Sequence, residues 1–479
     1  MKLFVLTVAC AVSVAACAWA QDSAPATTKA AAEPAVAVVS GSVDTVIVAV
    51  AGSELADPKA AAIDATAAVI IACGGQAKGL IVIEDSKDPA AVVAGVMEAG
   101  KGLPMIGTHG EAMVSDRSLK AGGVAVMAIG GKKASVATAV APLDKQRKNT
   151  AAALVKQLKD QKDVKVVFAL SEPDLSFEPG VTVEDFLFGM QEGFGKDVML
   201  FGGNCKPINR NDGGIQFKDG KTFNKNVVAM TVSGPIKYYG DHTTEFKPVG
   251  APAKATKVDG KWILELDGKP AAQVYRERRG MKPDEKFTAD SEHPIGVVVA
   301  PDRRYNRMIL EWKDAEGNMT GRPDSDQQVK TAEVKPGTET ALRFITAIPE
   351  GSLIQVMDYP GTSEAINESA KLAVEDMLKR AGKATPLVIL SSDCCARGSR
   401  LKKFSKNEGK DADEVKNGIV PVTKGKIPFF GFYAYGEIGP IRGPFLGLNY
   451  EYQQHTFVGL TLVIDEAAKE APTTKPAGI

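Results

Sequence analysis

The feature that most constrains the fold is a regular alternation of short apolar runs with segments of helical periodicity. The runs Val43–Val50, Gly79–Glu84 and Leu103–Gly107 have the length and the aliphatic content of buried strands. Between them, Asp57-Pro58 and Asp88-Pro89 each place an N-cap residue directly before a proline, a common start of a helix. This order predicts an α/β fold.

The alternation continues to the end of the chain. Further strands are expected at Val164–Leu170, Val198–Phe201, Leu387–Leu390, Ile427–Tyr433 and Thr456–Ile464. A helix is expected over Ser363–Ala381, with Gly382 as its stop. Gly123–Ile129 and Ala134–Ala141 suggest an antiparallel pair, and Lys261–Leu266 suggests a strand entering a turn at Asp267-Gly268. We therefore expect mixed sheets with packed helices (mixed α+β) in two tandem domains, 43–270 and 271–466.

The N-terminus has the pattern of an export signal. Met1-Lys2 is followed by an apolar run to Ala16 and by the cleavage-type tripeptide Ala18-Trp19-Ala20. We expect residues 1–20 to be removed and the protein to be periplasmic or extracellular. The alternative is a lipoprotein anchored at Cys17, which ends a lipobox-like tetrapeptide. Residues 21–42 and 467–479, rich in Ala, Pro and Thr, are expected to be a flexible linker and tail.

Charge and motifs exclude several classes of function. Lys plus Arg equals Asp plus Glu at 58 each, so the chain lacks the excess positive charge of a nucleic-acid-binding surface. The phosphate-loop, dinucleotide and common zinc motifs are absent from the sequence, so no cofactor and no metal are expected. No later stretch reaches the roughly 20 apolar residues of a membrane helix.

Three clusters of polar residues follow expected strands. The first is Gly107–Glu111, where Gly110 lets a ligand approach the backbone and Glu111 can accept from an amine. The second is Cys394–Arg397, where Arg397 suits a carboxylate and Cys394 is a candidate thiolate. Each has a structural alternative: a tight turn for the first, and a buried cysteine with an ion-paired arginine for the second.

The third cluster combines Tyr433–Gly439 with Gln454–Thr456. It places Tyr435, Gly436 and Glu437 near His455 and Thr456, which suits a polar ligand cleft as well as a packed sheet corner. Gly436-Glu437 also repeats the Gly110-Glu111 pair, so an internal duplication is one interpretation and coincidence the other.

Taken in order, these segments resemble the two-part FIST sensory module. The carboxy-terminal part is similar over Ile348–Met357, Cys394–Gly398, Gly431–Pro440 and Gln454–Leu460. The amino-terminal part is similar over Met105–Ala112 and Leu200–Cys205, and Ala255–Tyr275 resembles the link between the parts. The resemblance covers about residues 43–465.

The resemblance implies a ligand-sensing protein, with amino acids or small carboxylates as candidate ligands. The protein partner is left unspecified. The residues expected to contact the ligand are Arg397, Glu437, Gly436, Tyr435, His455, Thr456, Gly110, Glu111 and Cys394. In this hypothesis Arg397 binds the carboxylate of a zwitterion and Glu437 its amine. Two alternatives stay open: a thiol-dependent enzyme that uses Cys394 with His455 or His109 as base, and a structural or interaction protein of the envelope.

Overall fold

The computed structural model describes residues 34–173, 181–209, 213–282, 284–287, 293–321, 334–409, 411–445 and 448–469. The expected signal segment 1–20, Cys17 and most of the expected tail lie outside the described residues. Residues 38–41, which the sequence assigns to the linker, instead form strand β1 (Val38–Gly41), because their backbone pairs antiparallel with the next strand.

Most of the described chain forms a core of three units that share one order of main elements: a strand, a helix, a strand, a helical segment, a strand, a hairpin that leaves the sheet, and a closing strand. The second unit adds the short pair β11–β12 (Pro207–Asn209 and Gly213–Gly214), and the helical segment of the third contains more than one helix. The first unit contains β2 (Ile47–Ser53), α1 (Pro58–Ala72), β3 (Ala77–Glu84), α2 (Pro89–Gly100), β4 (Met105–His109), β5 (Glu111–Val114), β6 (Arg117–Ser118) and β7 (Val124–Gly130). The second contains β8 (Ser135–Pro142), α3 (Arg147–Leu158), β9 (Val164–Ser171), α5 (Val183–Phe194), β10 (Met199–Asn204), β11 (Pro207–Asn209), β12 (Gly213–Gly214), β13 (Gln216–Lys218), β14 (Lys221–Phe223) and β15 (Asn226–Ser233).

The third unit is interrupted after its first strand. It contains β16 (Ile236–Thr243) and then, after an insertion, α7 (Ser363–Ala381), β26 (Pro386–Cys394), α8 (Cys395–Glu408), a π-helical turn η1 (Val415–Ile419), α9 (Val420–Thr423), β27 (Phe429–Ala434), β28 (Glu437–Phe445), β29 (Leu448–Gln453) and β30 (Phe457–Ile464). A short helix, α10 (Glu466–Lys469), follows.

Each unit builds one sheet around a parallel pair of strands. The orders are β1-β2-β7-β3-β4-β13-β14 for the first sheet, β8-β15-β9-β10-β28-β29 for the second and β16-β30-β26-β27-β5-β6 for the third. In each sheet the parallel pair is β3–β4, β9–β10 or β26–β27, and its other neighbours run antiparallel. The sheets are therefore mixed, as the sequence predicts.

The last two strands of every sheet come from a different unit. The hairpin β5–β6 of the first unit joins the third sheet, β28–β29 of the third unit joins the second sheet, and β13–β14 of the second unit joins the first sheet. The three units thus exchange hairpins in a cycle. The duplication suggested by Gly110-Glu111 and Gly436-Glu437 is real in the structure, because both glycines stand where a strand leaves its own sheet, and the structure adds a third unit to it.

Each sheet is apolar on both faces because both of its faces are buried inside the protein. Alternate residues of β2 serve two different clusters: Val48 and Val50 join a central core shared by all three sheets, whereas Ile47, Ala49 and Ala51 pack against α1 and α2. The helices α7 and η1 cover the third sheet in the same way. The carboxyl ends of the three parallel pairs meet one another: the Lys206 N–H donates to the His109 carbonyl at 3.0 Å, and the Tyr435 N–H donates to the Asn204 carbonyl at 3.0 Å.

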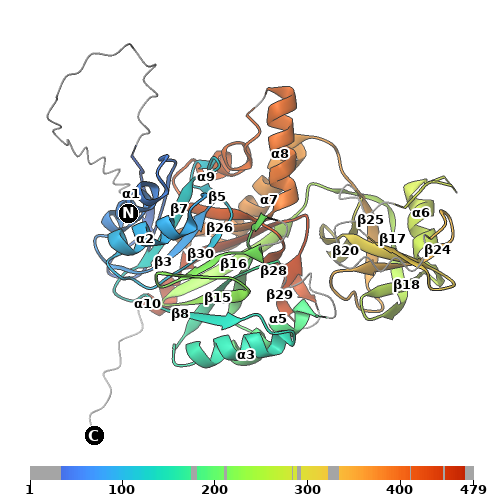
Figure 1. Cartoon of the computed structure of the whole chain (residues 1–479), viewed down its shortest axis with the longest axis horizontal. Coiled ribbons are helices and arrows are strands. Elements are labelled where there is room, and N and C mark those ends of the chain that lie inside the picture. Colours follow the sequence, from blue (N-terminus) through green and yellow to red (C-terminus); the bar gives the residue numbers. More distant parts are fainter. Residues whose placement is uncertain are drawn as a thin grey trace, which may run out of the picture.

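The insertion between β16 and α7 forms a separate β-rich unit, drawn beside the core in Figure 1. It contains β17 (Lys247–Asp259), β18 (Trp262–Leu266), β19 (Lys269–Pro270), α6 (Ala271–Arg279), β20 (Ile295–Ala300), β21 (Arg303–Arg307), β22 (Ile309–Asp314), β23 (Met319–Gly321), β24 (Glu339–Phe344) and β25 (Leu353–Asp358). Its strands share one sheet and one hydrophobic cluster.

The domain boundary expected from the sequence, residue 270, is the last residue of β19, inside the insertion. The strand β18 and the helix α6 on either side of it bury side chains in the same cluster, and the division of the chain into two domains stays a prediction. The expected antiparallel pair of Gly123–Ile129 with Ala134–Ala141 is wrong: β7 and β8 belong to different sheets, and β7 pairs with β2 and β3. The expected helix Ser363–Ala381 and the turn at Asp267-Gly268 are confirmed.

Candidate functional site

The first strand of each exchanged hairpin begins with a polar residue. In every sheet this residue lies beside the carboxyl end of one strand of the parallel pair. Glu111 of β5 lies opposite Tyr433, Gln216 of β13 lies opposite Thr108, and Glu437 of β28 lies opposite Gly203. All three positions carry a carboxylate or an amide. In α/β proteins, ligands bind beyond the carboxyl ends of parallel strands, so these three positions mark the candidate site.

The Glu111 position opens to solvent and gathers groups of both charges. Lys206, which follows β10, lies 2.8 Å from Asp85 and 3.2 Å from Glu111, and its side chain is 27% exposed. Lys402 of α8 forms a second ion pair with Glu111. We call Asp85, Glu111, Lys206, Lys402 and Tyr435 the open junction.

The charges of the open junction are mutually stabilised. Burial acts to raise the pKa of Glu111, but the Lys402 and Lys206 ammonium groups outweigh it and hold the pKa below its usual value. Burial acts to lower the pKa of Lys206, yet Asp85 and Glu111 raise it overall. Burial also raises the pKa of Tyr435 to about 12, so its phenol stays protonated. Near neutral pH the junction offers ammonium, carboxylate and hydroxyl groups side by side.

His109 extends this network into the interior. Its Nδ1 lies 2.9 Å from Glu84 Oε1, and its Nε2 lies 3.5 Å from Asp85 Oδ1. Both ring nitrogens therefore face carboxylates, which fixes the ring beside the strand end. The Gly110 N–H donates to the Glu84 carbonyl at 2.7 Å, so the backbone turns out of the first sheet at this point.

The Glu437 position is closed. Glu437 is fully buried, and its Oε2 accepts from Thr456 Oγ1 at 3.1 Å. The Cys394 N–H donates to the Thr456 carbonyl at 3.1 Å, which places the Cys394 thiol beside the same carboxyl group. Burial, with a further contribution from Cys394, raises the pKa of Glu437 well above its usual range. The raised pKa favours the neutral form of Glu437, whereas the sequence-based hypothesis requires a charged acceptor for an amine.

Arg397 is enclosed in a network of acids. Its guanidinium lies 2.7 Å from Asp393, 2.5 Å from Glu245 and 3.3 Å from Glu414, and all four side chains are 0% exposed. It also donates to Ser369 Oγ at 2.9 Å and to the Ile366 carbonyl at 3.1 Å. These partners occupy the donors that a ligand carboxylate requires, so the geometry supports the ion-pair alternative for Arg397.

Two further predicted residues also have structural surroundings. Hydrogen bonding to Cys395 and burial raise the pKa of the Cys394 thiol well above its usual value, which opposes a role as thiolate nucleophile. His455 is 1% exposed, packs edge-on against Phe246 at 5.7 Å, and accepts through its carbonyl from Asn306 of the insertion at 3.1 Å. His455 therefore belongs to the contact between core and insertion.

The structure thus divides the predicted residues into groups. The open junction contains Glu111 and Tyr435, with Gly110 beside them. The closed Glu437 position contains Cys394, Glu437 and Thr456, next to Gly436. Two separate networks contain Arg397 and His455. The sequence reasoning missed Asp85, Lys206 and Lys402. Asp85 directly follows β3, and Lys206 lies two residues after β10. The expectation that ligands bind beyond the carboxyl ends of parallel strands could therefore have found both. Lys402 lies on a helix, where nothing in the sequence marks it.

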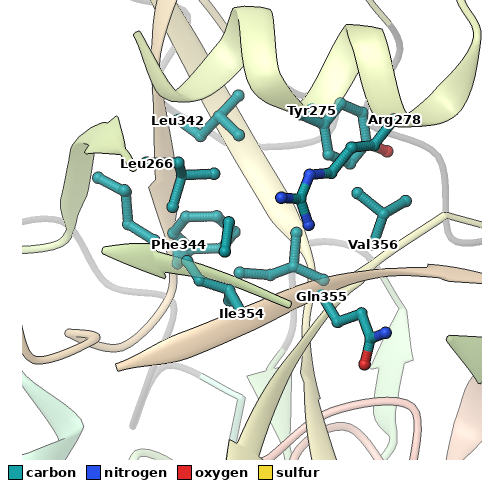
Figure 2. Close-up of a pocket in the computed structure, with 11 residues that line it drawn as sticks. Leu266, Tyr275, Arg278, Leu342, Phe344, Ile354, Gln355 and Val356 are labelled. Atoms are coloured by element: carbon teal, nitrogen blue, oxygen red, sulfur yellow. The ribbon is translucent and has the colours of Figure 1, made fainter. Parts of the chain in front are cut away.

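A pocket in the insertion is too small for an organic ligand. Figure 2 shows Arg278 reaching over apolar walls that include Leu266, Leu342, Phe344 and Val356. The free space is about 10 Å³, room for one water molecule. In the part of the chain that the structure describes, no cluster of three or more His, Cys, Asp or Glu side chains is arranged to hold a metal ion. Within the same residues, no helix is both long and apolar enough to cross a membrane.

Comparison with known proteins gives the family. The FIST N domain model matches residues 77–269, and the FIST C domain model matches residues 271–440. An uncharacterized protein of Mycobacterium bovis is 27% identical over 237 residues, which is 47% of this chain and 52% of the relative. An uncharacterized protein of Methanocaldococcus jannaschii is 24% identical over 207 residues, 42% of this chain and 36% of the relative. The chain spans about half the length or less of these relatives. Because the two models together match well over half of its residues, the chain belongs to the FIST family, whose domains are sensory and bind small ligands.

Proposed function

We propose that this protein is an exported sensor that binds a small charged molecule, an amino acid or a small carboxylate, at the open junction. The observation that carries the proposal is the convergence of Lys206, Asp85 and Glu111 at a partly exposed meeting point of strand ends. A ligand carboxylate would take Lys206 and Lys402 as partners, and a ligand ammonium would take Glu111 and Asp85. The roles first assigned to Arg397 and Glu437 thus pass to side chains that solvent can reach.

A thermal-shift screen of amino acids and small carboxylates tests the binding. A ligand present at 100 times its Kd should add about 2.7 kcal/mol to the free energy of unfolding. Lys206→Met removes one charge-assisted hydrogen bond and should weaken the best ligand by roughly 10- to 100-fold. Lys132→Met, which breaks only the exposed pair with Asp44, is the control and should bind as the wild type does. A ligand that Lys206→Met binds with wild-type affinity would place the site elsewhere.

Export is supported by the apolar run and the Ala18-Trp19-Ala20 tripeptide. N-terminal sequencing of the mature protein from its source cells distinguishes the alternatives. Gln21 at the N-terminus is the expected result, and a lipid-modified Cys17 indicates the lipoprotein. An intact Met1 contradicts both.

A further inference from the structure

The cysteine that follows Cys394 lies beside the open junction. Strand β26 pairs in parallel with β27, and Cys394 at its end lies opposite Ala434. The next residues along the two chain segments are Cys395, which begins α8, and Tyr435 of the open junction. Cys395 and Tyr435 therefore leave neighbouring strand ends at the same edge of the third sheet.

Helix α8 turns one of its faces to the same place. Lys402 is seven residues after Cys395 in this helix, which is about two turns, so both side chains lie on one face, about 10 Å apart along the axis. The Lys402 ammonium pairs with Glu111 of the open junction. The face that carries Cys395 is thus directed to the junction, and the Tyr435 phenol interacts electrostatically with both Cys395 and Lys206.

Cys395 is also a cysteine that a solute can reach. Among the cysteines that the structure describes, Cys73 and Cys205 are 0% exposed, Cys394 is 7% exposed, and Cys395 is half-buried. Burial raises the pKa of the Cys73 and Cys205 thiols to about 12, so these two stay protonated near neutral pH. A thiol must be both deprotonated and accessible to attack another molecule, so Cys395 is the candidate nucleophile beside the junction.

The groups around Cys395 select the kind of molecule that its thiol meets. Lys206 and Lys402 offer ammonium groups on side chains that are 27% and 64% exposed, and Glu111 and Asp85 offer carboxylates. A ligand with an α-ammonium and an α-carboxylate can pair with both kinds of group. If the ligand also contains a disulfide, it brings a bond that a thiol cleaves to the position of Cys395. Neither the thiol nor the charges alone indicate such a ligand, but together they do.

We propose that the open junction captures a small zwitterionic disulfide, of which cystine is the simplest example, and that Cys395 forms a covalent bond with it. This inference rests on the proposed function of the open junction and names the class of its ligand.

The capture is a thiol–disulfide exchange. The deprotonated sulfur of Cys395 attacks one sulfur of the ligand, and the S–S bond of the ligand breaks. The new bond is a mixed disulfide between Cys395 and one half of the ligand. The other half leaves as a thiolate and takes up the proton that Cys395 released. The ligand disulfide is itself the oxidant, so the step requires no further reactant.

A comparison of two disulfides tests the capture. The reduced full-length protein is incubated with cystine or with the neutral bis(hydroxyethyl) disulfide, and the rate of adduct formation at Cys395 is followed by mass spectrometry of its peptide. The ratio of the two rates is then divided by the same ratio in the urea-unfolded chain, where the junction no longer exists. We expect a quotient of about 10 or more, because a hydrogen bond to a charged group contributes about this factor.

Three variants separate recognition from reactivity. Lys206→Met should lower the quotient by roughly 10-fold, and its rate with the neutral disulfide reports any change in the thiol itself. Lys148→Met, which breaks only the exposed pair with Glu192, is the matched control and should behave as the wild type. Cys395→Ser should lose the adduct with cystine and keep the thermal shift with amino acids that contain no sulfur.

Three outcomes overturn the proposal. The first is a wild-type protein in which Cys395 forms no adduct with cystine. The second is a wild-type quotient of about 1, which makes Cys395 an accessible thiol without recognition; neither result needs a variant to fold. The third is a Lys206→Met protein with the wild-type quotient. In the first two cases, a thermal shift with sulfur-free amino acids leaves the proposed function intact, and the absence of every shift contradicts that function as well.

Discussion

At the scale of single residues, burial decides which charged side chains are available to a ligand. Arg397 and Lys206 both follow strand ends, but Arg397 is 0% exposed among three acids, whereas the Lys206 side chain is 27% exposed between two. A buried cation whose partners are all protein groups stabilises the fold, and a partly exposed one can exchange partners with a solute. Two cationic side chains that both follow strand ends therefore have different roles.

Arg397→Ala should destabilise the protein by about 3–5 kcal/mol, because it leaves Asp393, Glu245 and Glu414 without their buried cation. Urea unfolding measures the loss. Lys148→Ala, which breaks a pair whose side chains are 60% and 62% exposed, should cost no more than about 1 kcal/mol. Equal unfolding midpoints for the two variants would show that the Arg397 network is not structural.

Glu437 should make stability depend on pH in an unusual direction. Its raised pKa means that the folded state holds a proton that the unfolded state releases, so the free energy of unfolding falls as the pH rises above the ordinary value of 4.5. The contribution is at most about 1.4 kcal/mol per pH unit. Glu437→Gln cannot titrate, and its stability relative to wild type should rise from pH 5 to pH 8. A constant difference between the two urea-unfolding curves contradicts the assignment, and Glu192→Gln is the matched control.

At the scale of elements, the exchange of hairpins depends on a few positions where a strand changes sheet. Gly436 separates β27 from β28 with a φ of 130°, and a Cβ there would lie 1.6 Å from the Tyr452 hydroxyl. Tyr452 in turn donates to the Tyr435 carbonyl at 3.2 Å. Glycine is thus required both for the backbone angle and for the closeness of the tyrosine.

Gly436→Ala should therefore cost more than an ordinary glycine replacement in the left-handed region. Backbone strain contributes about 1–2 kcal/mol, and the displacement of Tyr452 adds about 1–3 kcal/mol. Gly361→Ala is the control, because Gly361 has a φ of 75° with open space around its Cβ. Urea unfolding of both variants measures the difference, and equal losses would mean that Tyr452 moves aside freely.

At the scale of the whole molecule, the cyclic exchange makes the three units interdependent. Each sheet is completed by a hairpin from another unit, and one hydrophobic core contains residues of all three sheets. The insertion has its own sheet, and all residues of its hydrophobic cluster except Ile441 of β28 belong to the insertion. The core should accordingly unfold as one cooperative body, and the insertion should open separately.

Native-state hydrogen exchange of three variants tests this division. Ile83→Ala in the first unit and Leu390→Ala in the third remove buried side chains of the shared core and should each lower the opening free energy of all three units by about 2–5 kcal/mol. Ile263→Ala removes a buried side chain of the insertion and should lower protection there alone. A Leu390→Ala protein in which the first unit keeps wild-type protection would contradict cooperative unfolding of the core.

The sequence by itself determined the local structure: apolar runs became strands, and Ser363–Ala381 became a helix ending at Gly382, because periodicity and capping act over a few residues. It also located Glu111 and Tyr435 at strand ends. Tertiary structure alone decided which strands pair, since β7 and β8 are neighbours in the chain but lie in different sheets. Tertiary structure likewise decided that Arg397 is buried in a network of ion pairs, because its partner Glu245 lies 152 residues away in the chain. Burial and pairing over such distances depend on the assembled fold, and no local pattern in the chain encodes them.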